Sequence, residues 1–301
     1  MTPTARAALE EAALAATQAS AVAVPEGPAR ERFARELLAP IANAVLAQHA
    51  RGARVIGVYG AQGSGKTTLA SSLAQLLRAH AGLNAVALSL DDFYLTRAHR
   101  LRVAARLHPL FATRGVPGTH DIPLLLRTLD ALLAPGPHGD HEVAVPRFDK
   151  AQDDRAPTAL RLRAPVDVVI LEGWCLGVPA EPPERLLIAC NALETAEDPG
   201  GRFRRCVNHR LAHDYATLAR RVDWLLALMV ESFEVSCAQR LEQEHVLRAT
   251  GRGGMSDVEV SAFMQRFERV TRWALCTMSE RADLSVALDA AHGPRAPLPW
   301  V

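Results

Sequence analysis

The stretch Gly60-Ala-Gln-Gly-Ser-Gly-Lys-Thr67 matches the pattern Gly-x4-Gly-Lys-[Ser/Thr] of a phosphate-binding loop. The preceding residues 54–59 are apolar enough for a short buried strand, and the spacing predicts a helix from Lys66 to about residue 80. In such a loop, glycines let backbone N–H groups wrap around a β-phosphate, and the helix N-terminus adds its positive end. The strand–loop–helix order therefore predicts a nucleotide site rather than a chance glycine-rich turn.

The polar residues of this loop have expected roles. Lys66 bridges the β- and γ-phosphates, and the Thr67 hydroxyl ligates Mg²⁺. The residues expected at the nucleotide are Gly60, Gln62, Gly63, Ser64, Gly65, Lys66, Thr67 and Thr68. The guanine-reading motif Asn-Lys-x-Asp does not occur in the sequence, because neither of the two lysines, Lys66 and Lys150, follows an asparagine. ATP is therefore the predicted nucleotide, with Mg²⁺ as its metal.

Apolar stretches alternate with helical ones along the rest of the chain. Further strands are expected at residues 84–90, 166–171, 224–230 and 284–288. Helices are expected at residues 123–133, 202–221 and 234–248, and Ser256-Asp-Val-Glu259 is a capping box that opens one more. This alternation predicts an α/β protein of the P-loop NTPase fold, with a five-stranded parallel sheet and helices on both faces.

Acidic residues follow two of the expected strands. Asp91 and Asp92 come directly after one, and Glu172 ends another. Ligands of open α/β sheets bind beyond the carboxyl ends of the strands, so these carboxylates are expected near the γ-phosphate. Asp91 is the predicted base for an acceptor hydroxyl, and Glu172 the predicted support for Mg²⁺ or its waters. The alternatives are helix capping for Asp91 and Asp92 and a solvated loop position for Glu172.

A second group of polar residues is predicted to bind the acceptor. Of the 34 basic residues only Lys66 and Lys150 are lysine, which indicates positions where arginine cannot replace a compact ammonium. The residues that form a candidate site for a small anion are Arg114, His120, Lys150 and Arg155. Surface charge is the alternative for Arg114 and Arg155. Asp92 and Asp121 are further candidates for this side, with helix capping as their alternative.

A glycine-rich break is the candidate hinge of a lid. Arg240, Arg248 and Arg252 flank or interrupt Gly251-Arg-Gly-Gly254. Basic residues on such a segment can close over ATP and neutralise charge in the transition state. Arg240 and Arg248 are the preferred nucleotide ligands. The alternative is a solvated helix face, because glutamates are interleaved with the arginines.

The composition limits the kinds of partner that the protein is expected to bind. The formal net charge is +1, which provides no global attraction to nucleic acid or to a membrane surface. No uninterrupted apolar run approaches the ~18 residues of a membrane span. The five cysteines are irregularly spaced and form no Cys-x-x-Cys motif, which favours a reduced, cytoplasmic protein. A small-molecule acceptor is therefore the expected partner, and self-association stays open.

The order of the motifs resembles a known family. Ser89-Leu-Asp-Asp-Phe-Tyr-Leu-Thr96, Arg114-Gly-Val-Pro-Gly-Thr-His-Asp121, Pro146-Arg-Phe-Asp-Lys150 and Val169-Ile-Leu-Glu-Gly-Trp174 follow the P-loop. This set resembles the plant-type D-glycerate 3-kinases and their fungal and bacterial kinase-like relatives. These proteins lie within the wider group of uridine, pantothenate and phosphoribulo-kinases.

The resemblance implies an activity and places residues in it. It implies transfer of phosphate from ATP to D-glycerate, giving 3-phosphoglycerate and ADP. Asp91 falls on the catalytic base, and Tyr94, Arg114, His120 and Asp121 fall on the acceptor side. One departure is Ala151-Gln-Asp-Asp-Arg155, which lacks the glycine-rich loop of relatives. A kinase for pantothenate or a nucleoside, and an ATP-binding switch without a small acceptor, are the alternatives.

The chain is expected to divide in two. Residues 1–50 form a helical N-terminal extension, which either packs on the core or mediates self-association. Residues 51–301 form the P-loop kinase domain, with acceptor and lid insertions at about 94–160 and 235–260.

Overall fold

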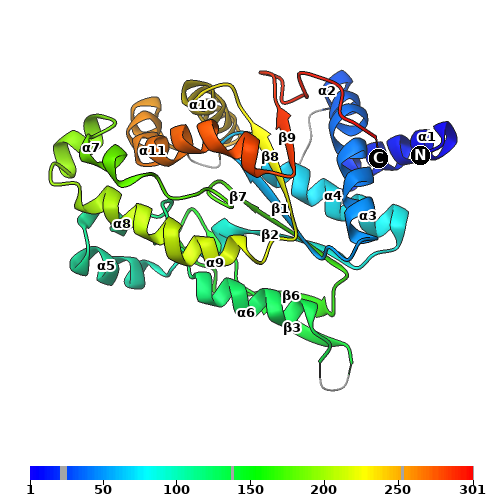
Figure 1. Cartoon of the computed structure of the whole chain (residues 1–301), viewed down its shortest axis with the longest axis horizontal. Coiled ribbons are helices and arrows are strands. Elements are labelled where there is room, and N and C mark those ends of the chain that lie inside the picture. Colours follow the sequence, from blue (N-terminus) through cyan, green and yellow to red (C-terminus); the bar gives the residue numbers. More distant parts are fainter. Residues whose placement is uncertain (21–25, 137–138, 252–253, 301) are drawn as a thin grey trace.

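The computed structural model describes residues 1–20, 26–136, 139–251 and 254–300. Its centre is the predicted five-stranded parallel sheet, and the structure gives the strand order β2-β7-β1-β8-β9 (Figure 1). The sheet strands are β1 Val55–Gly60, β2 Ala85–Ser89, β7 Val168–Gly173, β8 Trp224–Met229 and β9 Leu284–Ala287. All six residues of β1 and of β7 are buried, because helices cover both faces of the sheet.

Two apolar clusters cover the two faces. Ile56 and Val58 of β1 pack with the N-terminal helices and α4, and Tyr59 packs on the opposite side with α6, α8 and α11. This alternation follows from the two-residue period of a strand. The helices are α1 Pro3–Ala19, α2 Pro28–Arg32, α3 Ala39–His49, α4 Lys66–Ala81, α5 Arg97–Arg106, α6 Ile122–Leu133, α7 Ala192–Glu197, α8 Arg202–Arg210, α9 Ala216–Ala219, α10 Phe233–Ala249 and α11 Asp257–Arg281.

Shorter helical turns connect these elements. The 3₁₀ turns are η2 Leu90–Phe93, η3 Pro109–Ala112 and η4 Pro183–Leu187, and the π turns are η1 Phe33–Leu38 and η5 Leu211–Tyr215. The helix expected over residues 202–221 is therefore continued through a π turn between α8 and α9. The expected capping box at the start of α11 is confirmed, since Ser256 and Glu259 bond each other's backbone N–H groups.

The N-terminal helices lie against α4 (Figure 1). Leu9 and Ala13 of α1 are buried in the same cluster as Leu69 and Leu73 of α4. Whether residues 1–50 form a separate unit or mediate self-association stays a prediction. Among the described residues, every helix is too short or too polar to cross a bilayer.

Two small antiparallel pairs precede β7. β3 His141–Val145 pairs with β6 Leu160–Ala164, and β4 Phe148–Asp149 pairs with β5 Asp154–Arg155. Both pairs lie within the insertion expected at about residues 94–160. The β4–β5 pair, here called the acceptor hairpin (residues 147–155), carries Lys150 at its turn.

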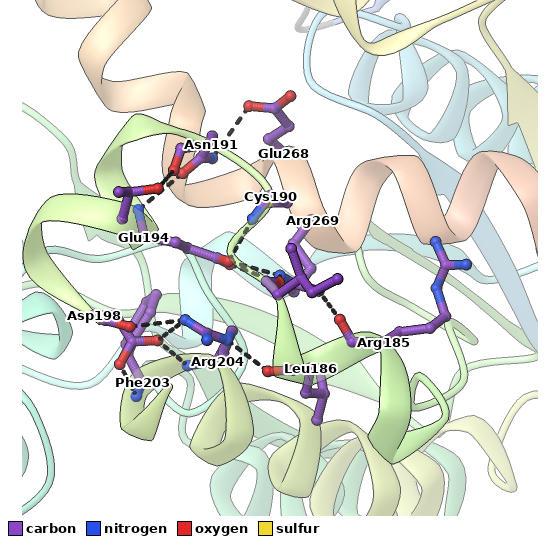
Figure 2. A network of polar contacts seen from close by, with 12 residues as sticks. Arg185, Leu186, Cys190, Asn191, Glu194, Asp198, Phe203, Arg204, Glu268 and Arg269 are labelled. Atoms are coloured by element: carbon purple, nitrogen blue, oxygen red, sulfur yellow. Dashed lines mark hydrogen bonds and ion pairs between the residues drawn. The ribbon is translucent and has the colours of Figure 1, made fainter. Parts of the chain in front are cut away.

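A buried polar network fixes the segment between β7 and α8 (Figure 2). The Arg269 guanidinium donates to both Glu194 carboxylate oxygens at 2.7 Å and to the carbonyls of Arg185 and Ile188. Arg204 donates likewise to Asp198 and to the Leu186 carbonyl. Each arginine thus satisfies backbone carbonyls of an irregular segment that lacks a sheet partner.

Loss of the buried Arg269 should destabilise the fold far more than loss of a nearby surface arginine. Arg269→Ala leaves Glu194 buried without its cation, so we expect a loss of about 3–5 kcal/mol in the free energy of unfolding. Arg272→Ala, three residues along α11, removes a half-exposed guanidinium that pairs with Glu234 and Glu268 and lies over the Phe233 ring, and it should cost about 1 kcal/mol. Urea unfolding of both variants tests this, and equal small losses would contradict the anchoring role of the network.

Candidate active site

The phosphate loop connects β1 to α4. Gly63 and Gly65 have φ near +82°, a conformation that favours glycine, and a Cβ at Gly63 would lie 2.6 Å from Gln239 Cβ. Helix α4 begins without a side-chain cap, so the N–H groups of its first turn are available to an anion. Helix α10 closes over this loop, because Ser236 Oγ donates to the Gln62 carbonyl at 2.7 Å. The predicted loop residues therefore lie together between β1 and α4, as a candidate site for a phosphate group that is here called the phosphate cradle (residues 60–68).

Glu172 lies beside the start of α4. Parallel pairing aligns Val58 of β1 with Glu172 of β7, and Thr67 Oγ1 donates to Glu172 Oε1 at 2.9 Å. The Glu172 side chain is buried, and this burial raises its pKa although the Lys66 ammonium opposes the shift. The alternative of a solvated loop carboxylate is wrong for Glu172.

The oxygen donors fit a Mg²⁺ ion that is held mostly by the nucleotide. Thr67 and Glu172 offer a hydroxyl and a carboxylate, the ligands that this hard cation prefers. Within the described residues, no group of three or more His, Cys, Asp or Glu side chains could hold a metal by itself. Mg²⁺ commonly keeps waters and phosphate oxygens as its remaining ligands, so two protein donors are sufficient.

Asp91 lies in the turn η2 that follows β2. Its Oδ1 accepts from the Tyr94 hydroxyl at 3.0 Å, and its Oδ2 accepts from Lys150 Nζ at 2.8 Å. Burial acts to raise the pKa of Asp91, but the Lys150 and Lys66 ammonium groups outweigh it, and the pKa falls well below its usual range. Asp91 is therefore ionised across the physiological range, and the cap of this turn is Ser89 instead.

Asp92 points away from Asp91 toward the acceptor hairpin. Its Oδ1 accepts from the Phe148 N–H at 3.1 Å, and Arg147 lies 3.4 Å from Oδ2. Burial raises the pKa of Asp92. The structure thus uses Asp92 to hold the hairpin, and a direct contact of Asp92 with the acceptor stays a prediction.

The acceptor hairpin is fixed by two arginines that share one carboxylate. Arg100, fully buried in α5, and Arg114 both pair with Asp153. The two guanidiniums lie 5.6 and 5.4 Å from the Phe148 ring, and Arg114 also donates to the Lys150 carbonyl. Arg114, predicted as an acceptor ligand, is therefore engaged in holding the turn that carries Lys150.

Arg155 and Asp121 form a second fixed pair. Arg155 Nη2 donates to Asp121 Oδ2 at 3.0 Å, and its Nε donates to the Tyr94 carbonyl at 2.9 Å. Asp121 Oδ1 also caps α6 by accepting from the Leu124 N–H. The capping alternative for Asp121 is thus correct, and the same carboxylate orients Arg155. Arg155 Nη1 has no hydrogen bond among the described residues.

His120 lies between two tyrosines. Its ring stacks on Tyr94 at 4.3 Å, and its Nδ1 bonds the Tyr215 hydroxyl, which also accepts from the Gly118 N–H. Burial lowers the pKa of His120 to about 4, although Asp91 opposes the shift. His120 is consequently neutral at pH 7. The sequence did not indicate Tyr215 as the partner of His120, because spacing along the chain does not show that η5 packs on residue 118.

The predicted lid residues divide into two groups. Arg240 follows Gln239, which packs on Gly63, and it pairs with Glu244 one turn along α10. Arg248 pairs with Asp257 at 2.6 Å, at the start of α11. Arg240 is thus brought to the phosphate loop, whereas Arg248 joins the two helices. Arg252 lies outside the described residues.

Several residues at the site carried no clear sequence signal. Ser236 and Gln239 contact the phosphate loop from α10, and Asp153 organises the acceptor hairpin. Asp153 adopts φ of +53°, a left-handed conformation in a non-glycine residue. The Ala151–Arg155 loop contains no glycine, so Asp153 adopts there the left-handed conformation that glycine adopts most readily.

Comparison with known proteins identifies relatives over most of the chain. The chain is 34% identical over 241 residues to "Uncharacterized kinase mug58" of Schizosaccharomyces pombe, covering 77% of this chain and 84% of that protein. It is 34% identical to "Probable ATP-dependent kinase TDA10" of Saccharomyces cerevisiae, covering 69% and 73%. It is 31% identical to the chloroplastic D-glycerate 3-kinase of Arabidopsis thaliana, covering 71% of this chain and 46% of that protein.

Solved structures agree with the sequence relatives. A D-glycerate 3-kinase from Cryptococcus neoformans superposes with a TM-score of 0.70 at 25% identity, covering 85% of this chain and 96% of that one. No family model matches the chain.

The buried neutral His120 should make stability depend on pH. Its pKa is depressed from 6.5 to about 4, so the unfolded state binds a proton that the folded state does not. His120 therefore makes its full contribution to the free energy of unfolding above pH 6.5. This contribution, on the order of 3 kcal/mol, is lost as the pH falls toward 4. We expect His120→Gln to flatten urea-derived unfolding free energies between pH 4 and 6.5. If the free energy of unfolding depended equally on pH in the wild type and in His120→Gln, the imidazole of His120 would not be buried in its neutral form.

Proposed function

This chain belongs to the kinase family of mug58 and TDA10, and we propose that it phosphorylates D-glycerate at the 3-hydroxyl with ATP. The observation that carries the proposal is the position of Asp91. It is ionised, it lies beyond β2 beside the phosphate loop, and cations surround it. A carboxylate there can take the proton of an acceptor hydroxyl while that hydroxyl attacks the γ-phosphorus.

The other residues of the site would bind the nucleotide, orient Asp91 and neutralise negative charge. Lys66 and the N–H groups of the loop would hold the β- and γ-phosphates, and Arg240 would approach them from α10. Thr67 and Glu172 would hold Mg²⁺, which when bound neutralises charge that develops on the phosphate oxygens. Tyr94 orients Asp91 through its hydroxyl, so that one carboxylate oxygen keeps a fixed direction.

The acceptor carboxylate is assigned to the Arg155 side of Asp91. Arg155 is fixed by Asp121 and by the Tyr94 carbonyl, and its Nη1 is available for an anion. An oriented guanidinium is well suited to a planar carboxylate. Arg155 and Asp91 both contact Tyr94, so they can reach two ends of one small acceptor. The D-glycerate 3-kinase relatives support the choice of a hydroxy acid over a nucleoside.

We also propose a reducing, cytoplasmic location. All five cysteines are free thiols in the structure, and Cys175 is buried. Free thiols persist where glutathione and thioredoxin keep them reduced.

The acceptor is tested by ADP release with Mg·ATP, using D-glycerate, L-glycerate, pantothenate, uridine and no acceptor. We expect strong stimulation by D-glycerate alone, with the 3-phosphate as product by NMR. Stimulation by uridine or pantothenate would replace the acceptor and leave the kinase assignment intact. Slow ADP release that no acceptor changes would instead favour an ATP-binding switch.

Removal of the proposed base gives a sharper test. Asp91→Ala should lower turnover by about 10²-fold or more, because the acceptor hydroxyl loses its proton acceptor. Binding of ATP, measured by calorimetry, should persist. Asp140→Ala, an exposed carboxylate on the loop before β3, is the matched control and should keep full turnover. Turnover of Asp91→Ala within a few-fold of wild type would remove Asp91 as the base.

A further inference from the structure

Lys150 is held against the proposed base by a rigid support. It lies at the turn of the acceptor hairpin, which Asp92, Arg100 and Arg114 fix from three directions. Its side chain is 61% exposed, yet its Nζ reaches 2.8 Å from Asp91 Oδ2. The ammonium is therefore both precisely placed and open to a ligand.

The charged groups near Lys150 lie on the side of the site where we propose that the nucleotide binds. After Asp91, the charged groups that act most strongly on its ammonium are Glu172 and Arg240. Glu172 bonds Thr67 at the start of α4, and Arg240 lies where α10 closes over Gly63. Lys150 is thus surrounded by the groups that border the phosphate cradle. Arg155, which we assign to the acceptor carboxylate, is held by the Tyr94 carbonyl and by Asp121 instead.

We propose that Lys150 is a second catalytic lysine, which moves from Asp91 to the γ-phosphoryl group of ATP and thereby frees Asp91 for the acceptor hydroxyl. This inference rests on the proposed kinase site but not on the identity of the acceptor. In the ligand-free state the ammonium neutralises Asp91 and occupies one of its oxygens. A γ-phosphoryl group carries more negative charge than a carboxylate, so it competes for the same cation.

The step balances without a further reactant. The acceptor oxygen forms a bond to the γ-phosphorus and gives its proton to Asp91, and the bond from the γ-phosphorus to the bridging oxygen breaks. ADP leaves with that electron pair. Lys150 stays protonated throughout, and it neutralises charge on the oxygens of the group in transfer.

The residue type supports this role over simple carboxylate binding. The chain uses arginine at 32 of its 34 basic positions, including Arg155 on the acceptor side. A planar carboxylate is matched at least as well by arginine as by lysine. A cation that transfers between Asp91 and a phosphoryl oxygen needs a compact charge on a flexible stem, which is what lysine provides.

Nucleotide binding tests the proposal without an acceptor. We would measure the affinities of fluorescent mant-ATP and mant-ADP with Mg²⁺ for wild type, Lys150→Gln and Arg147→Gln. Arg147 lies three residues away on the same hairpin, is 57% exposed and pairs with Asp92, so it is the matched control. We expect Lys150→Gln to weaken mant-ATP about 10-fold or more and mant-ADP less than about 3-fold. Equal effects on both nucleotides, or no effect on either, would overturn the contact with the γ-phosphoryl group.

Steady-state kinetics with the active acceptor then distinguish a role of Lys150 in phosphoryl transfer from a role in acceptor binding. We expect Lys150→Gln to lower kcat about 10²-fold while KM for the acceptor changes less than about 3-fold, and Lys150→Arg to restore only part of kcat. A rise of 10-fold or more in acceptor KM with kcat retained would make Lys150 an acceptor ligand and overturn the proposal. If no acceptor stimulates the wild type, D-glycerate is wrong, and the nucleotide measurement still decides the role of Lys150.

Discussion

Parallel pairing of β1 with β7 is the constraint on which the site depends. The register sets Val58 beside Glu172 and Tyr59 beside Gly173, so the phosphate loop and the carboxylate end of β7 leave the sheet at one edge. Pairing of β2 with β7 then places Ser89 beside Glu172, and Asp91 follows two residues later. Three short strands thus bring the phosphate loop, the proposed metal ligand Glu172 and the proposed base Asp91 together, although more than 100 residues separate Thr67 from Glu172.

The acceptor side is built differently, from irregular segments held by charged side chains. The buried Arg100 and the partly exposed Arg114 both pair with Asp153, and the Phe148 ring lies near both guanidiniums. Such a site is more costly to assemble, because each buried charge must be paired. It can also change in shape without disturbing the sheet.

The sequence predicted the parts of the site that local patterns encode. The phosphate loop, the five sheet strands and the capping box at Ser256 have signatures within a few residues. The β3–β6 pair was not predicted, although Leu160-Arg-Leu-Arg-Ala164 alternates apolar and basic residues as a strand with one exposed face does. The partnership of His120 with Tyr215 spans 95 residues and depends on a π turn. Asp92 resembles Asp91 in the sequence, and contacts with distant residues separate their surroundings: Asp91 pairs with Lys150, whereas Asp92 accepts from the Phe148 N–H.

The distribution of basic residues now has a physical explanation at particular positions. Arg100, Arg204 and Arg269 each donate to two or more backbone carbonyls as well as to a carboxylate, which requires the several donors of a guanidinium. Lysine at those positions would leave buried carbonyls without partners. At Lys66 and Lys150 no such set of carbonyls is present among the described contacts, and the ammonium instead faces carboxylates at the edge of the phosphate cradle. Arginine at these buried positions therefore fixes irregular backbone, whereas both lysines lie at the edge of the phosphate cradle.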